Sequence, residues 1–181
     1  MNKLTKLSRF LSYVLRHKPE ALGLEMTSEG WVSVDELIVK MNENGKSITF
    51  ATLKEVVLTD DKQRYALNED ETKIRANQGH SLDIDLNLQA VFPPEHLYHG
   101  TATRNLDSIR LQGLLKRNRH HVHLSENQDT AKRVGVRYGE PVILTILAKE
   151  MNHAGHCFYC SANGVWLTDT VPVEFIVFPV G

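Results

Sequence analysis

The chain has 181 residues, of which 41% are hydrophobic. It contains 21 Lys and Arg and 22 Asp and Glu, which give a formal net charge of −1. This composition is typical of a soluble globular protein of one domain or two small ones. The balanced charge excludes a strongly basic protein that coats nucleic acid, and it excludes an acidic disordered tail. Any phosphate chemistry must therefore depend on local charge.

Membrane insertion and secretion are not expected. The longest apolar run, around Val142 to Ala148, is far shorter than the roughly 20 residues that span a bilayer. The first residues have no continuous apolar segment, so we read no signal peptide. With only two cysteines a disulfide framework is excluded. We expect a protein of the reducing cytoplasm with no obligate protein partner.

Apolar residues near the N-terminus recur at three- and four-residue spacing and predict an amphipathic helix: Leu4, Leu7, Leu11, Val14 and Leu15. Pro19 must end this helix near Lys18, which places Arg16 and His17 in its last turn. Taken alone, two cations at a helix C-terminus need no explanation beyond the helix dipole.

Two further helices and a hairpin are predicted in the first half. Ser33 and Glu36 have the spacing of a capping box, and the helix that they begin should run to about Asn44, with Gly45 ending it. A third helix fits residues 49–58. Residues 64–67 and 72–76 flank a turn-rich segment and predict a β-hairpin. Three helices followed by a hairpin are the layout of a winged helix.

The second half has a different character, and we place the boundary between domains 1–90 and 91–181, in a segment rich in Gly, Ser, Asp and Asn that ends in Pro93-Pro94. Short strands are predicted at residues 97–99, 121–124, 141–147, 165–167 and 173–178, and helices at 104–112 and 127–138. This order predicts an α+β domain with a split sheet. The chain lacks a GxGxxG and a P-loop motif.

Several polar residues could carry chemistry, although each has an ordinary structural explanation. Arg64 opens the first hairpin strand, where a solvated edge charge is common. Arg119 lies in a predicted loop before a run of histidines. The tetrapeptide Tyr98-His99-Gly100-Thr101 places a glycine at a predicted strand end, where a ligand could approach the backbone closely.

A zinc site also has to be weighed, because His153, His156, Cys157 and Cys160 lie within eight residues. The histidines directly precede the CxxC pair, and no second ligand pair has the usual zinc-finger spacing. Free thiols that pack near a strand are favoured, and no metal is expected.

Seven segments occur in a specific order: LSYVLRHKPE, EGWVSVDELI, KQRYAL, IRANQGHS, LYHGT, HVHLS and NGVWLT. On these segments the chain resembles the RNA 2′-phosphotransferases of the KptA type, from about Leu4 to Phe178. The resemblance implies an N-terminal winged-helix lobe that binds RNA and phosphate and a C-terminal lobe of the ADP-ribosyltransferase type that binds NAD in a split sheet.

The resemblance further implies NAD-dependent removal of an internal 2′-phosphate from RNA, such as one left at a tRNA splice junction. The RNA 2′-phosphate is expected to attack the nicotinamide ribose and expel nicotinamide, which gives a 2′-phospho-ADP-ribosyl RNA. The ribose 2″-hydroxyl then attacks the phosphorus, and RNA with a 2′-OH and ADP-ribose 1″,2″-cyclic phosphate are released.

Carried over by motif, the implied catalytic residues are Arg16, His17, Arg64 and Arg119. Guanidinium groups match the oxygens of a phosphomonoester bidentately. Histidine is the one member of the set whose ordinary pKa lies near neutrality, so His17 is the candidate for proton transfer. We expect the two lobes to share this site.

The implied NAD-binding residues are carried over in the same way: His99, Gly100, Thr101, Gly113, Leu114, His123, Ser125 and Arg137. Protein ADP-ribosyltransferases often have a Glu on the late strand that here reads NGVWLT, where this chain has Val165. The nucleophile of the implied reaction is already an anion, and a carboxylate would repel it.

Two alternatives stay open. An ADP-ribosyltransferase could modify terminal phosphates of RNA or DNA and stop after the first step. A winged-helix nucleic-acid binder could use its second lobe as a ligand sensor, but the expected recognition helix, residues 49–58, has a single Lys and a single Glu.

Overall fold

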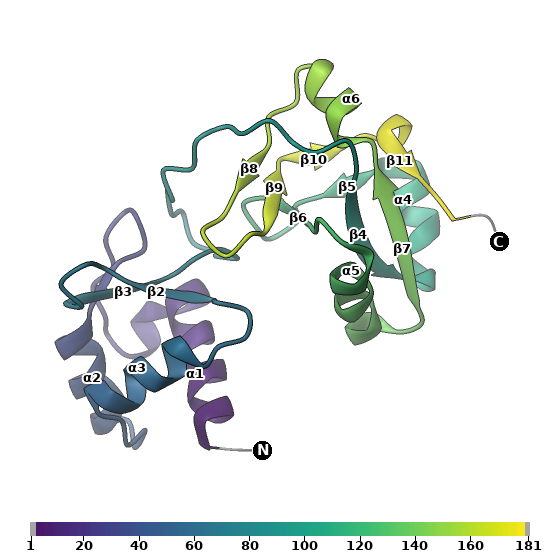
Figure 1. Cartoon of the computed structure of the whole chain (residues 1–181). Helices are drawn as coiled ribbons and strands as arrows, with labels where there is room; N and C mark the ends of the chain where they lie inside the picture. The colour runs from purple at the N-terminus through teal and green to yellow at the C-terminus, as the bar shows by residue number, and fades with distance from the viewer. Residues whose placement is uncertain (1–2, 180–181) are drawn as a thin grey trace. The chain divides into compact units, whose positions relative to one another are not determined.

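The computed structural model describes residues 3–179. The chain divides into two compact units, Met1–Asn87 and Leu88–Gly181 (Figure 1). We call them unit 1 and unit 2 and treat each by itself. Each unit has its own cluster of buried hydrophobic residues.

Unit 1 contains three helices, α1 (Lys3–His17), α2 (Val34–Glu43) and α3 (Phe50–Leu58). The Ser33 Oγ accepts the backbone N–H of Glu36 at 3.4 Å, and the Thr49 Oγ1 accepts that of Thr52 at 3.2 Å. These contacts satisfy backbone donors that the first turn of a helix leaves without partners. A short 3-10 helix, η1 (Pro19–Ala21), follows α1, so the predicted end of that helix is confirmed.

A three-stranded antiparallel sheet completes unit 1. Its strands are β1 (Val32–Ser33), β2 (Tyr65–Leu67) and β3 (Lys73–Ala76), in the order β1-β3-β2. The predicted hairpin is confirmed as β2 and β3, and β1 adds an edge strand that was not predicted. Leu11, Leu15 and Ile74 are fully buried, so α1 and the sheet share one core.

Unit 2 is built from several small antiparallel sheets. Strands β4 (Leu97–Ala102), β7 (Pro141–Ile146) and β11 (Ile176–Val177) form one sheet in the order β11-β7-β4. A second sheet has β6 (Val122–Leu124), β9 (Trp166–Thr168) and β8 (Tyr159–Cys160) in the order β6-β9-β8. Strand β5 (Leu114–Leu115) pairs with β10 (Thr170–Val171).

The two three-stranded sheets meet at one point. Tyr98 of β4 and Ser125, which follows β6, exchange two backbone hydrogen bonds of 2.8 Å. This bridge brings the ends of two separate sheets together, and the predicted mixture of helices and small sheets is confirmed.

The helices of unit 2 are α4 (Leu106–Gln112), α5 (Gln128–Gly135) and α6 (Ala148–His153). Helix α5 packs directly on β4 (Figure 1). A Cβ atom on Gly100 would lie 1.7 Å from the carbonyl oxygen of Ala131. Only glycine therefore allows the helix backbone to approach the strand so closely.

Two predicted strands of unit 2 differ from the structure. The strand at residues 97–99 continues through Ala102, because Thr101 and Ala102 pair with Val142 and Pro141. The YHGT segment thus lies inside a strand, and its prediction as a strand end is wrong. The predicted strand 173–178 is a 3-10 helix, η4 (Val173–Phe175), followed by the two residues of β11.

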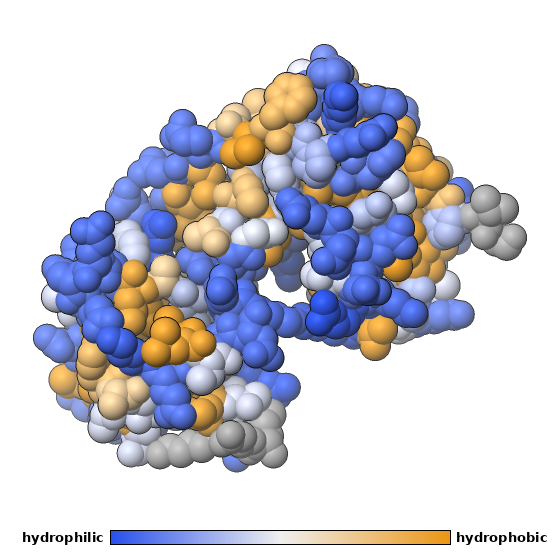
Figure 2. Space-filling model, in the orientation of Figure 1, coloured by the Kyte–Doolittle hydropathy of each residue, from blue (hydrophilic) through white to orange (hydrophobic). Residues whose placement is uncertain are grey.

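The predicted helices of unit 2 are shorter than expected. Helix 127–138 ends at Gly135 and continues as the 3-10 helix η3 (Val136–Tyr138), and α4 is preceded by η2 (Thr103–Asn105). On the visible surface of both units, hydrophobic side chains are scattered among hydrophilic ones (Figure 2). Within residues 3–179, no helix is long and apolar enough to cross a membrane.

Candidate functional site

In unit 1, Arg16 and His17 at the end of α1 lie against residues 79–81. The Arg16 guanidinium is the nearest group to Gly79, since a Cβ on that glycine would be 3.5 Å from Nη1. The backbone N–H of Ser81 donates to the Arg16 carbonyl at 2.9 Å, and the Ser81 hydroxyl bonds to Nδ1 of His17 at 3.0 Å. These contacts fix the helix end and the His17 ring in one orientation.

Arg64 directly precedes β2 and is held by Asp60. The carboxylate of Asp60 accepts the backbone N–H of Arg64 at 2.6 Å and forms an ion pair with Nη1 of the same residue. The side chain of Asp60 is 5% exposed and that of Arg64 is 28% exposed. The solvated edge charge expected from the sequence is thus an oriented and mostly buried arginine.

Tyr65 places Arg16 and Arg64 in one neighbourhood. Its hydroxyl donates to the Ser8 carbonyl. Burial raises the pKa of this phenol, while the hydrogen bond with the Ser8 side chain and the positive charges of Arg16 and Arg64 act in the opposite direction. Tyr65, the residue after Arg64, is thus tied to α1, the helix whose last turn carries Arg16 and His17.

The segment after β3 adds polar atoms beside the same residues. The backbone N–H of Asn77 donates to the Arg64 carbonyl at 2.8 Å, and the Asn77 side-chain amide donates to the Gln63 carbonyl at 2.6 Å. The side-chain oxygens of Asn77 and Gln78 are buried with no hydrogen-bond partner among the described atoms. Buried acceptors of this kind are costly unless something donates to them.

In unit 2 a short chain of contacts links His99, His123 and Arg119. The His99 Nδ1 lies 3.0 Å from the His123 carbonyl, and the Arg119 Nη1 lies 3.4 Å from Nδ1 of His123. Since a carbonyl only accepts and a guanidinium only donates, Nδ1 of His99 carries a proton and Nδ1 of His123 does not. Burial lowers the pKa of His99, the hydrogen bond to the His123 carbonyl acts in the opposite direction, and the nearby charge of Arg119 lowers the pKa as well.

The YHGT segment is tied to the same place by the Tyr98–Ser125 bridge, so the structure brings together His99, His123, Ser125 and Arg119. Gly100 and Thr101 are buried. Gly100 lies under the α5 backbone, and the Thr101 hydroxyl accepts a hydrogen bond from Asn105 at 3.1 Å. Both residues thus have packing roles that the sequence did not indicate.

The other predicted NAD-binding residues lie on different elements. Gly113 ends α4 with a φ of +72°, and Leu114 is buried in β5, which pairs with β10 rather than with β4 or β6. A Cβ on Gly113 would lie 2.2 Å from the Val171 carbonyl oxygen. Arg137 is exposed in η3, which packs against β4.

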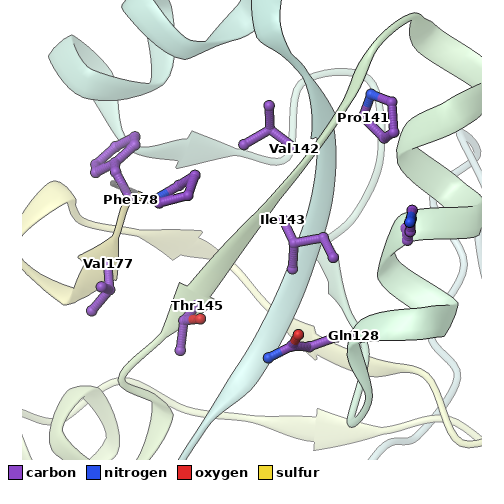
Figure 3. Close-up of a pocket in the computed structure, with 9 residues that line it drawn as sticks. Gln128, Pro141, Val142, Ile143, Thr145, Val177 and Phe178 are labelled. Carbon is purple, nitrogen blue, oxygen red and sulfur yellow. The ribbon is translucent and has the colours of Figure 1, made fainter. Parts of the chain in front are cut away.

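A separate pocket of about 490 Å³ lies over β7. Figure 3 shows Ile143 and Thr145 of β7 on its floor, Gln128 of α5 on one side, and Val177 and Phe178 on the other. Its lining shares no member with the predicted catalytic or NAD-binding residues. We therefore describe two candidate sites, one in each unit: the residues around Arg16 and Arg64 in unit 1 and the His99 cluster in unit 2.

Sequence analysis missed Asp60, Ser81 and the amides of Asn77 and Gln78. Asp60 precedes Arg64 by four residues, a spacing that could have suggested the ion pair, whereas the contact of Ser81 with His17 spans 64 residues. Cys157 and Cys160 are free thiols. Across residues 3–179, no group of three or more His, Cys, Asp and Glu side chains is arranged to hold a metal ion.

Comparison with known proteins gives one consistent result. A family model described as RNA 2′-phosphotransferase, Tpt1 / KptA family, matches residues 2–170. A "Probable RNA 2′-phosphotransferase" of Burkholderia lata is 54% identical over 95% of this chain and 89% of its own length. Proteins of the same description from Nostoc punctiforme and Escherichia coli O45:K1 are each 50% identical, over 97% and 98% of this chain and 97% and 92% of their own lengths. The chain therefore belongs to the RNA 2′-phosphotransferase, Tpt1 / KptA family.

Proposed function

We propose that this protein removes an internal 2′-phosphate from RNA with NAD as the acceptor. The reaction has two steps. The RNA 2′-phosphate attacks the anomeric carbon of the nicotinamide ribose, and nicotinamide leaves. The ribose 2″-hydroxyl then attacks the phosphorus, the RNA 2′-oxygen leaves with a proton, and ADP-ribose 1″,2″-cyclic phosphate is formed. The observation that carries this proposal is the family match, together with the contacts of Arg16, His17 and Arg64 with the single segment of residues 77–81.

In unit 1, Arg16, His17 and Arg64 are proposed to bind the phosphate. A phosphomonoester carries about −1.5 to −2 charges and three acceptor oxygens, and arginine presents donors in a rigid fork that fits them. Asp60 orients the Arg64 side chain before any phosphate binds. Pre-orientation lowers the entropy lost when the phosphate binds.

His17 is the proposed proton carrier of the second step. Its Nδ1 is held by the hydroxyl of Ser81 at 3.0 Å. An imidazole can take the proton of the ribose 2″-hydroxyl or give one to the departing RNA oxygen. The Ser81 contact keeps the ring in a single orientation, as an effective proton carrier requires.

In unit 2, His99, His123 and Ser125 are proposed to bind NAD, with Gly100, Thr101, Gly113, Leu114 and Arg137 as the remaining predicted contacts. These three polar residues suit a dinucleotide. The His123 carbonyl fixes the ring of His99, and Nε2 of His99 is then an acceptor for a ribose hydroxyl. Arg119 is joined to His123, so its guanidinium is positioned beside the same group. When bound, NAD supplies an electrophilic ribose carbon with a good leaving group.

The architecture that we propose follows from the same family assignment. Unit 1, which contains three helices and a hairpin, is proposed to be a winged helix. Unit 2, with two small sheets joined at the Tyr98–Ser125 bridge, is proposed to be of the ADP-ribosyltransferase type. The substrate is proposed to be tRNA-like RNA in the cytoplasm.

The decisive experiment is incubation of the purified protein with NAD and a short 2′-phosphorylated RNA, followed by mass analysis. We expect nicotinamide, RNA with a 2′-OH and ADP-ribose 1″,2″-cyclic phosphate. A stable ADP-ribosylated RNA as the only product would instead favour the second candidate, an ADP-ribosyltransferase of terminal phosphates. No reaction with NAD would refute both.

A further inference from the structure

The loop before β6 is the most basic short segment of the chain. Residues 116–121 read Lys-Arg-Asn-Arg-His-His and contain no acid. The first four side chains are exposed, and the two histidines are partly exposed. The net charge of −1 therefore conceals a local cluster of three cationic side chains in unit 2.

The loop also carries backbone strain at its tip. Arg117 has a φ of +52°, in the left-handed region that residues with a side chain seldom adopt. The turn is closed by a hydrogen bond from the Arg119 N–H to the Lys116 carbonyl at 3.1 Å. A strained residue in a solvent-facing turn persists only when the surrounding structure fixes it, and such positions gather at functional sites.

Next to this loop two aromatic rings lie in contact. The rings of His121 and Tyr159 have centroids 5.5 Å apart and are inclined by 58°. At this inclination neither ring lies flat on the other. Both rings are partly exposed, so a planar group can stack on them.

Tyr159 lies on β8 and the loop leads into β6, and these are the two outer strands of the β6-β9-β8 sheet. Tyr159 and His123 are both paired with Leu167, one from each side, and so project from the same face. The His123 ring contacts Arg119. The aromatic pair is therefore continuous with the proposed phosphate-binding arginine of this unit.

We propose that residues 116–121 and Tyr159 form a binding platform for the single-stranded RNA that flanks the 2′-phosphate. Lys116 and Arg117 contact the RNA phosphates, and an unpaired base stacks on the ring of Tyr159 beside His121. Basic side chains beside aromatic rings are the usual means of binding single strands without sequence preference. The inference rests on the proposed function for its choice of RNA.

The position of Asp169 agrees with this assignment. Its carboxylate pairs with Lys116 at 3.2 Å, and its side chain is 71% exposed. An exposed pair of this kind contributes little to stability and is easily exchanged. A phosphate can replace the carboxylate without a large penalty, whereas a buried ion pair would oppose RNA binding.

The test measures binding of a short fluorescein-labelled single-stranded RNA that lacks a 2′-phosphate, by anisotropy and without NAD. Tyr159→Leu keeps an apolar side chain but loses the ring, and we expect about 5- to 100-fold weaker binding. Tyr159→Phe keeps the ring and should bind as the wild type does. Lys116→Ala/Arg117→Ala should lower the slope of log affinity against log salt by about 1.4.

A matched control removes two charges elsewhere in unit 2. Arg133 in α5 and Lys149 in α6 are exposed, and Arg133→Ala/Lys149→Ala should change neither the affinity nor the slope. Circular dichroism spectra show whether Tyr159→Leu is folded. The double variant Lys116→Ala/Arg117→Ala tests the platform even if Tyr159→Leu does not fold.

Wild-type affinity in both Tyr159→Leu and Lys116→Ala/Arg117→Ala would overturn the platform while leaving the proposed function intact. Binding of an acidic peptide in preference to RNA would also overturn it. Conversely, loss of RNA binding in these variants, with no turnover of 2′-phosphorylated RNA by the wild type, would uphold the platform and refute the proposed function.

Discussion

Asp60 offers the sharpest test of how unit 1 prepares an arginine for phosphate. Its carboxylate accepts the backbone N–H of Arg64 at 2.6 Å and pairs with the guanidinium of the same residue. We predict that Asp60→Ala lowers both stability and activity, and that Asp60→Asn lowers activity with a smaller loss of stability. The difference arises because asparagine still offers an oxygen to the backbone N–H but carries no charge.

The magnitude follows from burial. With Asp60 only 5% exposed, its removal leaves a backbone donor without a partner, at a cost of about 1–3 kcal/mol. The ion pair adds less than a fully buried one would, because Arg64 is 28% exposed and water replaces part of the interaction. We therefore expect about 2 kcal/mol of lost unfolding free energy for Asp60→Ala and about 1 kcal/mol for Asp60→Asn, measured by urea denaturation.

Activity has to be resolved into its two steps to separate positioning from stability. If Asp60 acts by orienting Arg64, then Asp60→Asn should accumulate ADP-ribosylated RNA on a gel, as Arg64→Ala should. A purely structural role would slow both steps together. The exposed neighbour Asp61 is the matched control, and Asp61→Ala should behave as the wild type does in both assays.

A double-mutant cycle between Asp60 and Arg64 completes the test. Residues that act as one unit give non-additive effects, whereas independent sites add within about 0.3–0.5 kcal/mol. Stability losses that add for Asp60→Ala and Arg64→Ala, together with an unchanged ratio of the two steps in Asp60→Asn, would refute the proposed positioning role.

Three further predictions concern the other site residues. Arg119→Ala should slow the second step more than the first, since charge builds on the phosphoryl oxygens there; a stall with unreacted 2′-phosphate RNA on the gel would contradict this. Gly100→Ala should lower the melting temperature by several degrees, because a Cβ 1.7 Å from the Ala131 carbonyl oxygen overpacks the helix interface by about 1–3 kcal/mol; weaker NAD binding with an unchanged melting temperature would oppose it. Burial lowers the pKa of His99, so the unfolded chain binds this proton more readily and stability falls as the pH decreases through the ordinary histidine value, with a slope of at most about 1.4 kcal/mol per pH unit. Urea denaturation at several pH values should show that His99→Gln loses the contribution of this histidine to the pH dependence of unfolding free energy. A pH dependence in His99→Gln identical to that of the wild type would contradict the prediction.

Much of unit 1 could be predicted because its signals are local. Ser33 and Thr49 begin helices through contacts with residues three positions later, and Pro19 lies next to the end of α1. Each contact depends on a few neighbouring residues, so spacing in the sequence is sufficient. Strand β1 could not be found in this way, because a strand of two residues exists only through its pairing with β3.

Unit 2 was harder to predict because its geometry depends on distant partners. Strand β4 continues past Gly100 since β7, some 40 residues later, supplies Val142 and Pro141 as partners. Gly100 is predicted to contact NAD, and the structure adds a packing reason for the glycine, because the backbone of α5 leaves no room for a Cβ there. The bond between His99 and His123 spans 24 residues, and spacing in the sequence carries no signal for it.

The chain uses its basic residues in two different ways, and salt should separate them. Arg64 is paired with a buried carboxylate, so its charge is partly neutralised and its geometry is fixed. The loop of residues 116–121 is exposed and contains no acid, so its field extends into solvent and is screened within about 8–10 Å at physiological salt. Added salt should therefore weaken RNA capture through the loop while leaving the chemical steps that depend on Arg64 nearly unchanged. The small net charge is then no obstacle to RNA binding, because we assign the attraction of RNA to Lys116 and Arg117 and the phosphate chemistry to Arg16, Arg64 and Arg119.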